Sequence, residues 1–291
     1  MLEPWLQQRL GLAVHRMEPV GGGSIHRCWR LDLIDGSRAF LKTNRHAALP
    51  WLQAEVEGLE ALAAVAPATL LLPKPLACER VGDQAVLLLS WLEFSATADP
   101  AAWQRCGLDL ACLHKASVAA GDGQGCFGWS RDNVIGAMPQ PNGWSRDWAG
   151  FFVEQRLAHQ LQLASASGLE FRGAGLLLTR ARARLQGHQP EPALVHGDLW
   201  RGNADLLVTG GAALYDPAVH RADREVDLAM AQLFGGFPAP FFAGYHQGWP
   251  LPPDADARVD LYNLYHLLNH ANLFGGGYVR QAQQVIDALI R

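Results

Sequence analysis

The sequence predicts an α+β fold with two lobes: a small antiparallel β-sheet with one main helix, then a larger, mainly helical lobe. Up to residue 92, apolar and polar residues alternate within several short segments. Tight turns such as Asp35-Gly36 and Gly82-Asp83 join these segments. Beyond residue 93, apolar residues recur at helical spacing over longer segments. We therefore expect a β-rich first lobe at residues 1–92, which carries a glycine-rich loop, and a helical second lobe at residues 93–291.

The composition argues against several classes of protein. Apolar residues make up 49% of the 291 residues and charged residues 18%, and the net charge is −4 without a long run of either sign. Nucleic acid is therefore not an expected partner, because a phosphate backbone requires a basic face. No apolar stretch approaches 18 residues and the N-terminus lacks the pattern of a signal peptide, so we expect a cytoplasmic protein without a membrane partner. The five scattered cysteines form no CxxC pair, which disfavours a zinc site or a disulfide framework.

The first lobe begins with an expected helix at about 2–12 and strands at about 14–20, 28–34 and 38–42. Gly21, Gly22, Gly23 and Ser24 lie between the first two strands. A run of glycines lets the backbone approach a ligand and turn its N–H groups inward, as a phosphate cradle requires. Such a run is more often a flexible turn, and no Gly-Lys-Ser/Thr follows, so it is not a Walker A loop.

Lys42 and Glu55 are expected to form an ion pair. Lys42 lies near the end of an apolar strand, roughly 20 residues past the glycines, as expected of a lysine that binds ATP phosphates. Glu55 belongs to a helix that begins near Pro50, and it lies about 50° from the centre of that helix's apolar stripe, whereas Glu57 lies on the opposite face. A carboxylate that faces the core needs a cationic partner, and Lys42 supplies one.

Two further strands, at about 76–80 and 84–89, lead into Ser90, Trp91 and Leu92. We expect these three residues to form the hinge between the lobes, where backbone groups would bind the adenine edge. This interpretation rests on their order along the chain, since nothing in the side chains themselves requires it.

The second lobe is expected to contain several helices and one long loop. Asp99 should cap a helix that starts at Pro100 and ends at His114. Helices are then expected at about 147–166, 169–186, 254–272 and 277–290. The loop at 121–146 contains Asp132 and Asn133 and is rich in glycine and tryptophan, so we expect it to be ordered near the cleft.

The residues that carry chemistry lie in His196-Gly197-Asp198-x4-Asn203 and in a following Asp216. Phosphoryl transfer from ATP needs this arrangement: Asp198 would accept the proton of the attacking hydroxyl, and Asn203 and Asp216 would hold Mg²⁺. A short hairpin, formed by residues 206–208 and 212–215, should bring both metal ligands to one end.

Residues 223–230 follow this site and are expected to support it from below. Asp227 should bond backbone N–H groups of the catalytic loop, and Arg224 and Glu225 should form ion pairs.

The chain resembles the fructosamine kinase (ketosamine-3-kinase) family, which belongs to the protein-kinase-like and aminoglycoside-phosphotransferase-like group. The motifs that carry the resemblance span nearly the whole chain. They are Gly21–Ile25, Phe127-Gly128-Trp129, Asn133-x-Ile135-Gly136, Pro139-Gln140-Pro141-Asn142-x-Trp144, His196–Asn203, Asp216-Pro217-Ala218 and Asp223-Arg224-Glu225-x-Asp227-Leu228-Ala229-Met230.

This resemblance implies a protein-kinase-like fold and an ATP- and Mg²⁺-dependent kinase that phosphorylates the 3-hydroxyl of free or protein-bound ketosamines, a step of protein deglycation. It implies Asp198 as the catalytic base, Asn203 and Asp216 as metal ligands, and Lys42 with Glu55 as the phosphate-positioning pair. The nucleotide would also meet Gly21–Ser24 and the hinge at Ser90–Leu92. On the substrate side the resemblance places Trp200, as a stacking wall, with His220, Asp132 and Asn133 nearby. We expect a monomer or a weak homodimer.

Two departures from the family pattern are visible. Some members carry a cysteine where this chain has Ser24, so redox control through that position is not expected. The segment His220-Arg221-Ala222 replaces the family's usual residues before Asp223. The resemblance therefore does not identify which ketosamine is preferred. Other small hydroxyl substrates, of the aminoglycoside, choline or methylthioribose type, use the same catalytic residues. A non-catalytic nucleotide-binding pseudokinase is the third possibility, although no catalytic residue is missing.

Overall fold

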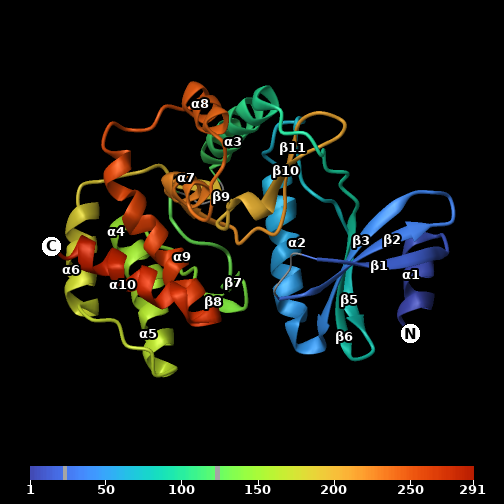
Figure 1. The fold of residues 1–291 in the computed structure, drawn as a ribbon, viewed down its shortest axis with the longest axis horizontal. Coiled ribbons are helices and arrows are strands. Elements are labelled where there is room, and N and C mark those ends of the chain that lie inside the picture. Colours follow the sequence, from blue (N-terminus) through green and yellow to red (C-terminus); the bar gives the residue numbers. More distant parts are fainter. Residues whose placement is uncertain (22–24, 122–124) are drawn as a thin grey trace.

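The computed structural model describes residues 1–21, 25–121 and 125–291, and it has two lobes (Figure 1). The first lobe is built on an antiparallel five-stranded sheet in the order β1-β2-β3-β6-β5. Its strands are β1 (Val14–Val20), β2 (Arg27–Leu33), β3 (Arg38–Arg45), β5 (Pro75–Val81) and β6 (Gln84–Ser90). Each of these strands was expected from the sequence, and the observed bounds differ by a few residues at most.

Strand β6 lies in the sheet between β3 and β5. Its successive side chains point to opposite faces of the sheet, and both faces are covered. Val86 and Leu88 pack with Leu6 of α1 (Leu2–Leu10) on one face. Ala85, Leu87 and Leu89 pack on the other face, where α2 (Leu49–Ala63) contributes Leu52 and Leu59. A three-residue 3₁₀ turn, His46–Ala48, connects β3 to α2. The main helix of the lobe is thus fixed against the strands that carry the nucleotide-side residues.

A second sheet joins the two lobes. Strand β4 (Leu70–Leu71), which follows α2, pairs in parallel with β11 (Ala212–Leu214), and β11 pairs with β10 (Ala204–Leu206). The linker after β6 also reaches this hairpin, because Ser95 N–H donates to Leu206 O at 2.8 Å. The hairpin predicted after Asn203 is therefore present, starts two residues earlier than expected, and is bound on both sides.

Helix α3 (Pro100–Ala120) begins as expected, with the Asp99 carboxylate accepting a hydrogen bond from Ala101 N–H at 2.9 Å. It does not end at His114, as the sequence analysis predicted, but continues for six residues. The segment after His114 contains no helix breaker until Gly121, which adopts the left-handed conformation of a C-terminal cap (φ 70°). Helix α8 (Ala239–Gly248), which the sequence analysis did not predict, packs across α3.

The rest of the second lobe surrounds an apolar core between α4 (Trp148–Phe152), α9 (Val259–Phe274) and α10 (Gly277–Leu289). The loop expected at 121–146 contains a short hairpin, β7 (Asn133–Ile135) with β8 (Met138–Gln140). The remaining elements are α4 (Trp148–Phe152), a π-helical segment at Val153–Ala158, α5 (His159–Ala166), α6 (Ala174–Leu185), β9 (Ala193–Val195), β12 (His220–Ala222), α7 (Glu225–Gln232), a 3₁₀ turn at Ala255–Arg258, α9 (Val259–Phe274) and α10 (Gly277–Leu289). None of the described helices is long and apolar enough to cross a membrane.

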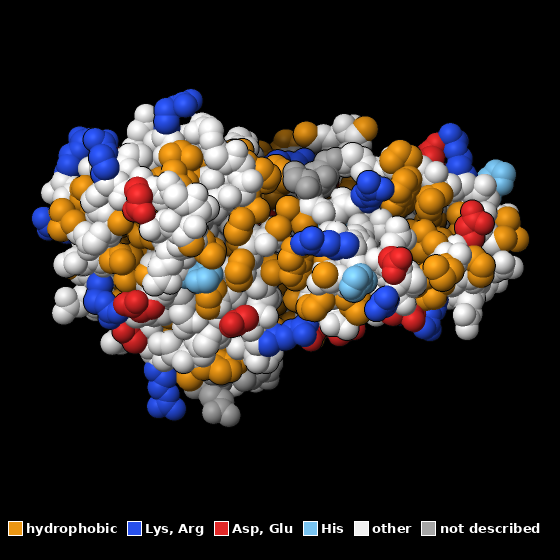
Figure 2. All heavy atoms as spheres, turned by 90° about the horizontal axis from the view of Figure 1, so that it is seen from below, with side chains coloured by type: hydrophobic (Ala, Val, Ile, Leu, Met, Phe, Trp, Pro, Cys, Tyr) orange, Lys and Arg blue, Asp and Glu red, His pale blue; other side chains and the backbone are white. Residues whose placement is uncertain are grey.

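One face of the molecule shows how charge is distributed (Figure 2). Lys and Arg side chains are spread among Asp, Glu, apolar and neutral side chains over both lobes. This mixed pattern agrees with the small net charge of −4.

Close packing of α3 against α8 generates a stability prediction. A Cβ atom on Gly107 would lie 1.8 Å from the Phe241 carbonyl oxygen, and one on Gly244 would lie 1.8 Å from the Gln104 carbonyl oxygen. Gly107→Ala should therefore lower the free energy of unfolding by at least about 2 kcal/mol, because both backbones must move apart. Denaturant unfolding measures this change.

Gly175→Ala in α6 is the matched control, since a Cβ there meets nothing within 4 Å. It should leave stability unchanged or raise it by up to about 1 kcal/mol, because alanine favours a helix over glycine. Equal stability of the two variants would contradict close α3–α8 packing.

Candidate active site

The loop of residues 196–203 leaves β9 in a turn that only glycine fits. Gly197 has φ 80°, and a Cβ there would lie 2.1 Å from the Ala218 carbonyl oxygen. The Asp227 carboxylate, in the first turn of α7, accepts hydrogen bonds from His196 N–H at 2.7 Å and Gly197 N–H at 2.9 Å. The prediction that Asp227 bonds the backbone of this loop is therefore confirmed. Burial alone would raise the pKa of Asp227, but its hydrogen bonds, first that from His114, hold the pKa below its usual value.

Asp198 and Asn203 are joined within this loop. Asn203 lies in a short 3₁₀ turn, Arg201–Asn203, and its Nδ2 donates to the backbone oxygen of Asp198 at 2.9 Å and to Asp198 Oδ2 at 3.1 Å. Burial, and then the nearby Asp216, raise the pKa of Asp198 to about 7. A carboxylate with such a pKa is suited to accept a proton near neutral pH, and a cation bound beside it would lower the pKa.

Asp216 follows β11 and meets Lys42 from the other lobe. Its backbone is left-handed (φ 57°), a conformation that aspartate adopts more readily than most residues. Lys42 Nζ forms ion pairs with Asp216 Oδ1 and, at 2.7 Å, with Glu55 Oε1. The pair predicted between Lys42 and Glu55 is thus present. Burial would lower the pKa of Lys42, but Asp216 and Glu55 outweigh it and raise the pKa, so the ammonium stays charged.

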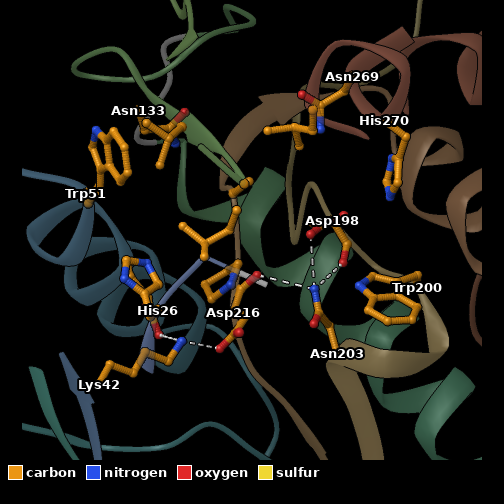
Figure 3. A pocket seen from close by; sticks show the side chains of 18 of the residues that line it. His26, Lys42, Trp51, Asn133, Asp198, Trp200, Asn203, Asp216, Asn269 and His270 are labelled. Carbon is orange, nitrogen blue, oxygen red and sulfur yellow. Dashed lines mark hydrogen bonds and ion pairs between the residues drawn. The ribbon is translucent and has the colours of Figure 1, made fainter. Parts of the chain in front are cut away.

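These groups face one cavity between the lobes (Figure 3). The cavity has a volume of about 360 Å³, and Lys42, Glu55, Asp198, Asn203 and Asp216 are among the residues that line it. The Asn203 amide nitrogen is the hydrogen-bond donor to Asp198, which leaves its Oδ1 available. A carboxylate and an amide oxygen are hard ligands of the kind that Mg²⁺ prefers. Asp216 and Asn203, which line the cavity, therefore fit a magnesium ion.

The sequence-predicted substrate residues separate into two groups. Trp200 and Asn133 line the cavity. The Trp200 ring packs over Gly202, where a Cβ would lie 2.2 Å from the indole. The Asn133 side chain is already engaged, since its Nδ2 donates to Val219 O at 2.8 Å and its Oδ1 accepts from Gln140 and Asn142. Asn133 therefore holds the backbone that follows Asp216.

His220 and Asp132 do not line the cavity, which corrects the expectation that they face the substrate. His220 lies on β12, which pairs with β9, and its ring is buried against Phe151. Burial lowers the pKa of His220 well below its usual value, so the ring is neutral. Asp132 is exposed on the loop before β7, where its Oδ1 accepts a hydrogen bond from Asn142 N–H at 2.8 Å.

On the nucleotide side, Gly22, Gly23 and Ser24 lie outside the described residues, and Gly21 is exposed at the end of β1. Ser90 N–H donates to Lys74 O at 2.9 Å, and the indole of Trp91 donates to Glu93 at 2.8 Å. The described lining of the cavity does not extend to Ser90, Trp91 or Leu92. Their role as an adenine-binding hinge stays a prediction.

Arg224 and Glu225 were expected to form ion pairs below the site. Glu225 does so, with Arg258 Nε at 2.7 Å from its Oε2. Arg224 instead stacks over the Trp249 ring, 4.0 Å from its centroid, and donates to the carbonyl oxygens of Trp249 and Pro250.

An aromatic wall that was not predicted from the sequence lies on the second-lobe side of the cavity and is formed by Phe234, His270, Phe274 and Tyr278. The ring centroids of Phe234 and His270 lie 4.7 Å apart, and those of His270 and Tyr278 lie 5.0 Å apart. A sequence signal was available, because Leu-Phe-Gly-Gly occurs twice, at 233–236 and 273–276. Figure 3 shows His270 and Trp200 on the same side of the cavity as Asp198.

Comparisons with known proteins bear on the family and the fold of this chain. Residues 3–291 match the family model described as fructosamine kinase. A probable ketoamine kinase of Synechocystis is 44% identical over 279 residues, which cover 96% of this chain and 91% of that protein. A crystal structure of a putative fructosamine-3-kinase from Haemophilus somnus superposes with a TM-score of 0.90 at 26% identity, covering 100% of this chain and 97% of that one.

A more distant structure shares the fold alone. The aminoglycoside phosphotransferase APH(4)-Ia, in a ternary complex with ADP and hygromycin B, has a TM-score of 0.63 at 18% identity, covering 100% of this chain and 98% of that one. The two-lobed, kinase-like architecture predicted from the sequence is therefore confirmed.

The hydrogen bonds of Asp227 generate a prediction about the loop. In Asp227→Asn, an amide NH₂ replaces one acceptor oxygen, so at least one of the buried N–H groups of His196 and Gly197 loses its partner. The free energy of unfolding should fall by about 1–3 kcal/mol. Turnover should fall as well, because Asp198 follows directly on the loosened turn.

Asp287→Asn is the control, since Asp287 is 42% exposed in α10 and pairs with Arg172 at the surface. Surface pairs contribute at most about 1 kcal/mol. Thermal unfolding and steady-state kinetics of both variants test the prediction, which fails if Asp227→Asn matches wild type in both.

Proposed function

The chain belongs to the fructosamine kinase family and is an ATP-dependent kinase, and from this premise we propose that it phosphorylates the 3-hydroxyl of ketosamines, free or protein-bound, as a step of deglycation repair. The proposal rests mainly on one observation: the aromatic wall lines the same cavity as Asp198, Asn203, Asp216 and Lys42. Named relatives are probable ketoamine kinases, which supports a fructosamine or ribulosamine as the acceptor.

In the proposed reaction the substrate hydroxyl attacks the γ-phosphorus of ATP, its proton passes to Asp198, and ADP leaves. Lys42 would bind phosphate oxygens in place of Asp216. The oxygens of Asn203 and Asp216 would hold Mg²⁺, which offsets the negative charge of the phosphates when bound. Little covalent chemistry is required of the protein, because positioning and electrostatics account for most of catalysis in phosphoryl transfer.

The distribution of charge in the cavity supports a sugar-bearing substrate. Among the described lining residues, the lysine and the carboxylates are Lys42, Glu55, Asp198 and Asp216, all at the phosphate-transfer end. Burial lowers the pKa of His270, which keeps the wall uncharged near neutral pH. An aromatic wall suits the C–H faces of a sugar chain and, through cation–π attraction, its secondary ammonium group. A polycationic aminoglycoside would find no carboxylate on this wall.

A substrate panel tests the proposal. Fructosyl-lysine, ribulosyl-lysine and an aminoglycoside are each incubated with the enzyme and MgATP, and the phosphate is located by ¹H–³¹P correlation NMR. A ketosamine should be consumed and carry the phosphate on C3. Phosphorylation of the aminoglycoside alone, or of another ketosamine hydroxyl, would contradict the proposal.

The role of Asp198 is tested by Asp198→Asn. Turnover should fall about 10²–10⁴-fold, because an amide cannot accept the hydroxyl proton, while affinity for MgATP stays near that of wild type. Asp83→Asn, at a side chain 97% exposed in the β5–β6 turn, is the control and should keep wild-type turnover. Near-normal turnover of Asp198→Asn would remove Asp198 from its proposed role.

A further inference from the structure

We propose that His26 is an additional phosphate ligand of this enzyme, donating a hydrogen bond from Nε2–H to an oxygen of the nucleotide's β- or γ-phosphate. The inference rests on the proposed function, since it takes ATP to be the occupant of this end of the cavity. His26 lies directly before β2, lines the cavity, and is drawn in Figure 3 on the same side as Lys42.

The side-chain amide of Asn44, on β3, has one possible orientation. Arg45 N–H donates to Asn44 Oδ1 at 2.8 Å, and a backbone N–H can only donate. Asn44 Nδ2 donates to Ile25 O at 3.1 Å, and a carbonyl oxygen can only accept. Two independent backbone groups thus place the oxygen on one side and the NH₂ on the other.

This orientation determines the tautomer of His26. Asn44 Nδ2 lies 3.0 Å from His26 Nδ1, so Nδ1 accepts the hydrogen bond and carries no proton. A neutral imidazole has one N–H group, which must then be on Nε2. Burial, and next the charge of Lys42, lower the pKa of His26 to about 4, which keeps the ring neutral at physiological pH.

The Nε2–H group is available to a ligand. Within residues 1–21, 25–121 and 125–291, the hydrogen bonds of His26 involve Nδ1 and the backbone oxygen but leave Nε2 without an acceptor. Figure 3 draws the His26 ring beside Lys42 and Asp216, at the phosphate end of the cavity that all three residues line. The aromatic wall, where the ketosamine is proposed to bind, is contributed by α9, α10 and the α7–α8 connection instead.

The ring is held on a rigid support. Arg27, the next residue, pairs with Thr43 in the β2–β3 ladder, and Asn44 pairs with Ala85 of β6. A donor fixed on a sheet loses little freedom when it binds, so it suits an acceptor that must be held in place. A neutral N–H beside the charged Lys42 would bind a phosphate oxygen without adding to the positive charge.

Two substitutions separate the two ring nitrogens. In His26→Asn, the amide oxygen can replace Nδ1 as acceptor for Asn44, but the donor toward the cavity is lost. In His26→Gln, the longer side chain carries an N–H group near the position of Nε2. His26→Asn should weaken the binding of Mg–AMP-PNP about ten- to a hundredfold, as expected for a hydrogen bond to a charged acceptor, and His26→Gln should recover most of the affinity.

Isothermal titration calorimetry of the full-length variants measures these affinities, with AMP as a second ligand. AMP lacks the β- and γ-phosphates, so His26→Asn should bind it as wild type does, and KM for the ketosamine should change little. His15→Asn, at an exposed histidine of β1, is the control and should bind both ligands as wild type does. Equal Mg–AMP-PNP affinity of His26→Asn and wild type would overturn the inference.

A measurement on the unsubstituted protein does not depend on whether a variant folds. Long-range ¹H–¹⁵N NMR should show that His26 is protonated on Nε2 alone. The chemical shift of this Nε2 should change when Mg–AMP-PNP is added. Protonation on Nδ1 would overturn the inference. Weaker Mg–AMP-PNP binding by His26→Asn supports it even if no ketosamine is phosphorylated, a result that would overturn the proposed function alone.

Discussion

The buried ammonium of Lys42 holds the two lobes together, because it pairs with a carboxylate from each of them. It lies on β3 and meets Glu55 of α2 and Asp216 of the second lobe. Inside a protein, an ion left without its partner costs several kcal/mol, so these three segments hold one another in place. The two partners differ in exposure: the Glu55 side chain is 10% exposed and that of Asp216 is 46% exposed. In the proposed reaction, Asp216 would therefore be the partner that leaves Lys42 for a cation, while Glu55 would keep the lysine in the cleft.

Side-chain amides hold the backbone that follows Asp216. Asn133 and Gln140, from β7 and β8, donate to the carbonyl oxygens of Val219 and Ala218. The π-helical segment supplies Arg156, which donates to Asn142 Oδ1 at 2.7 Å and so steadies the same hairpin. A left-handed aspartate persists only where its surroundings determine it, and this network is what determines it here.

The sequence predicted the parts of the site that depend on local spacing. Helical periodicity pointed Glu55 toward Lys42, and the hairpin between Asn203 and Asp216 follows from its turn residues. The resemblance supplied the activity, which spacing alone cannot identify among small-molecule kinases. Contacts between distant elements were not predictable. His220 is buried because its short strand pairs with β9 and its ring packs against Phe151, which is distant in the sequence. The aromatic wall likewise forms only when α9, α10 and Phe234 come together.

The exchange of partners at Lys42 is the central claim, and a crystal structure with Mg–AMP-PNP tests it most directly. The account predicts that Lys42 Nζ keeps Glu55, leaves Asp216 and binds a phosphate oxygen, while Asp216 and Asn203 coordinate the magnesium ion. A complex in which Asp216 remains paired with Lys42 and the metal is bound elsewhere would contradict it.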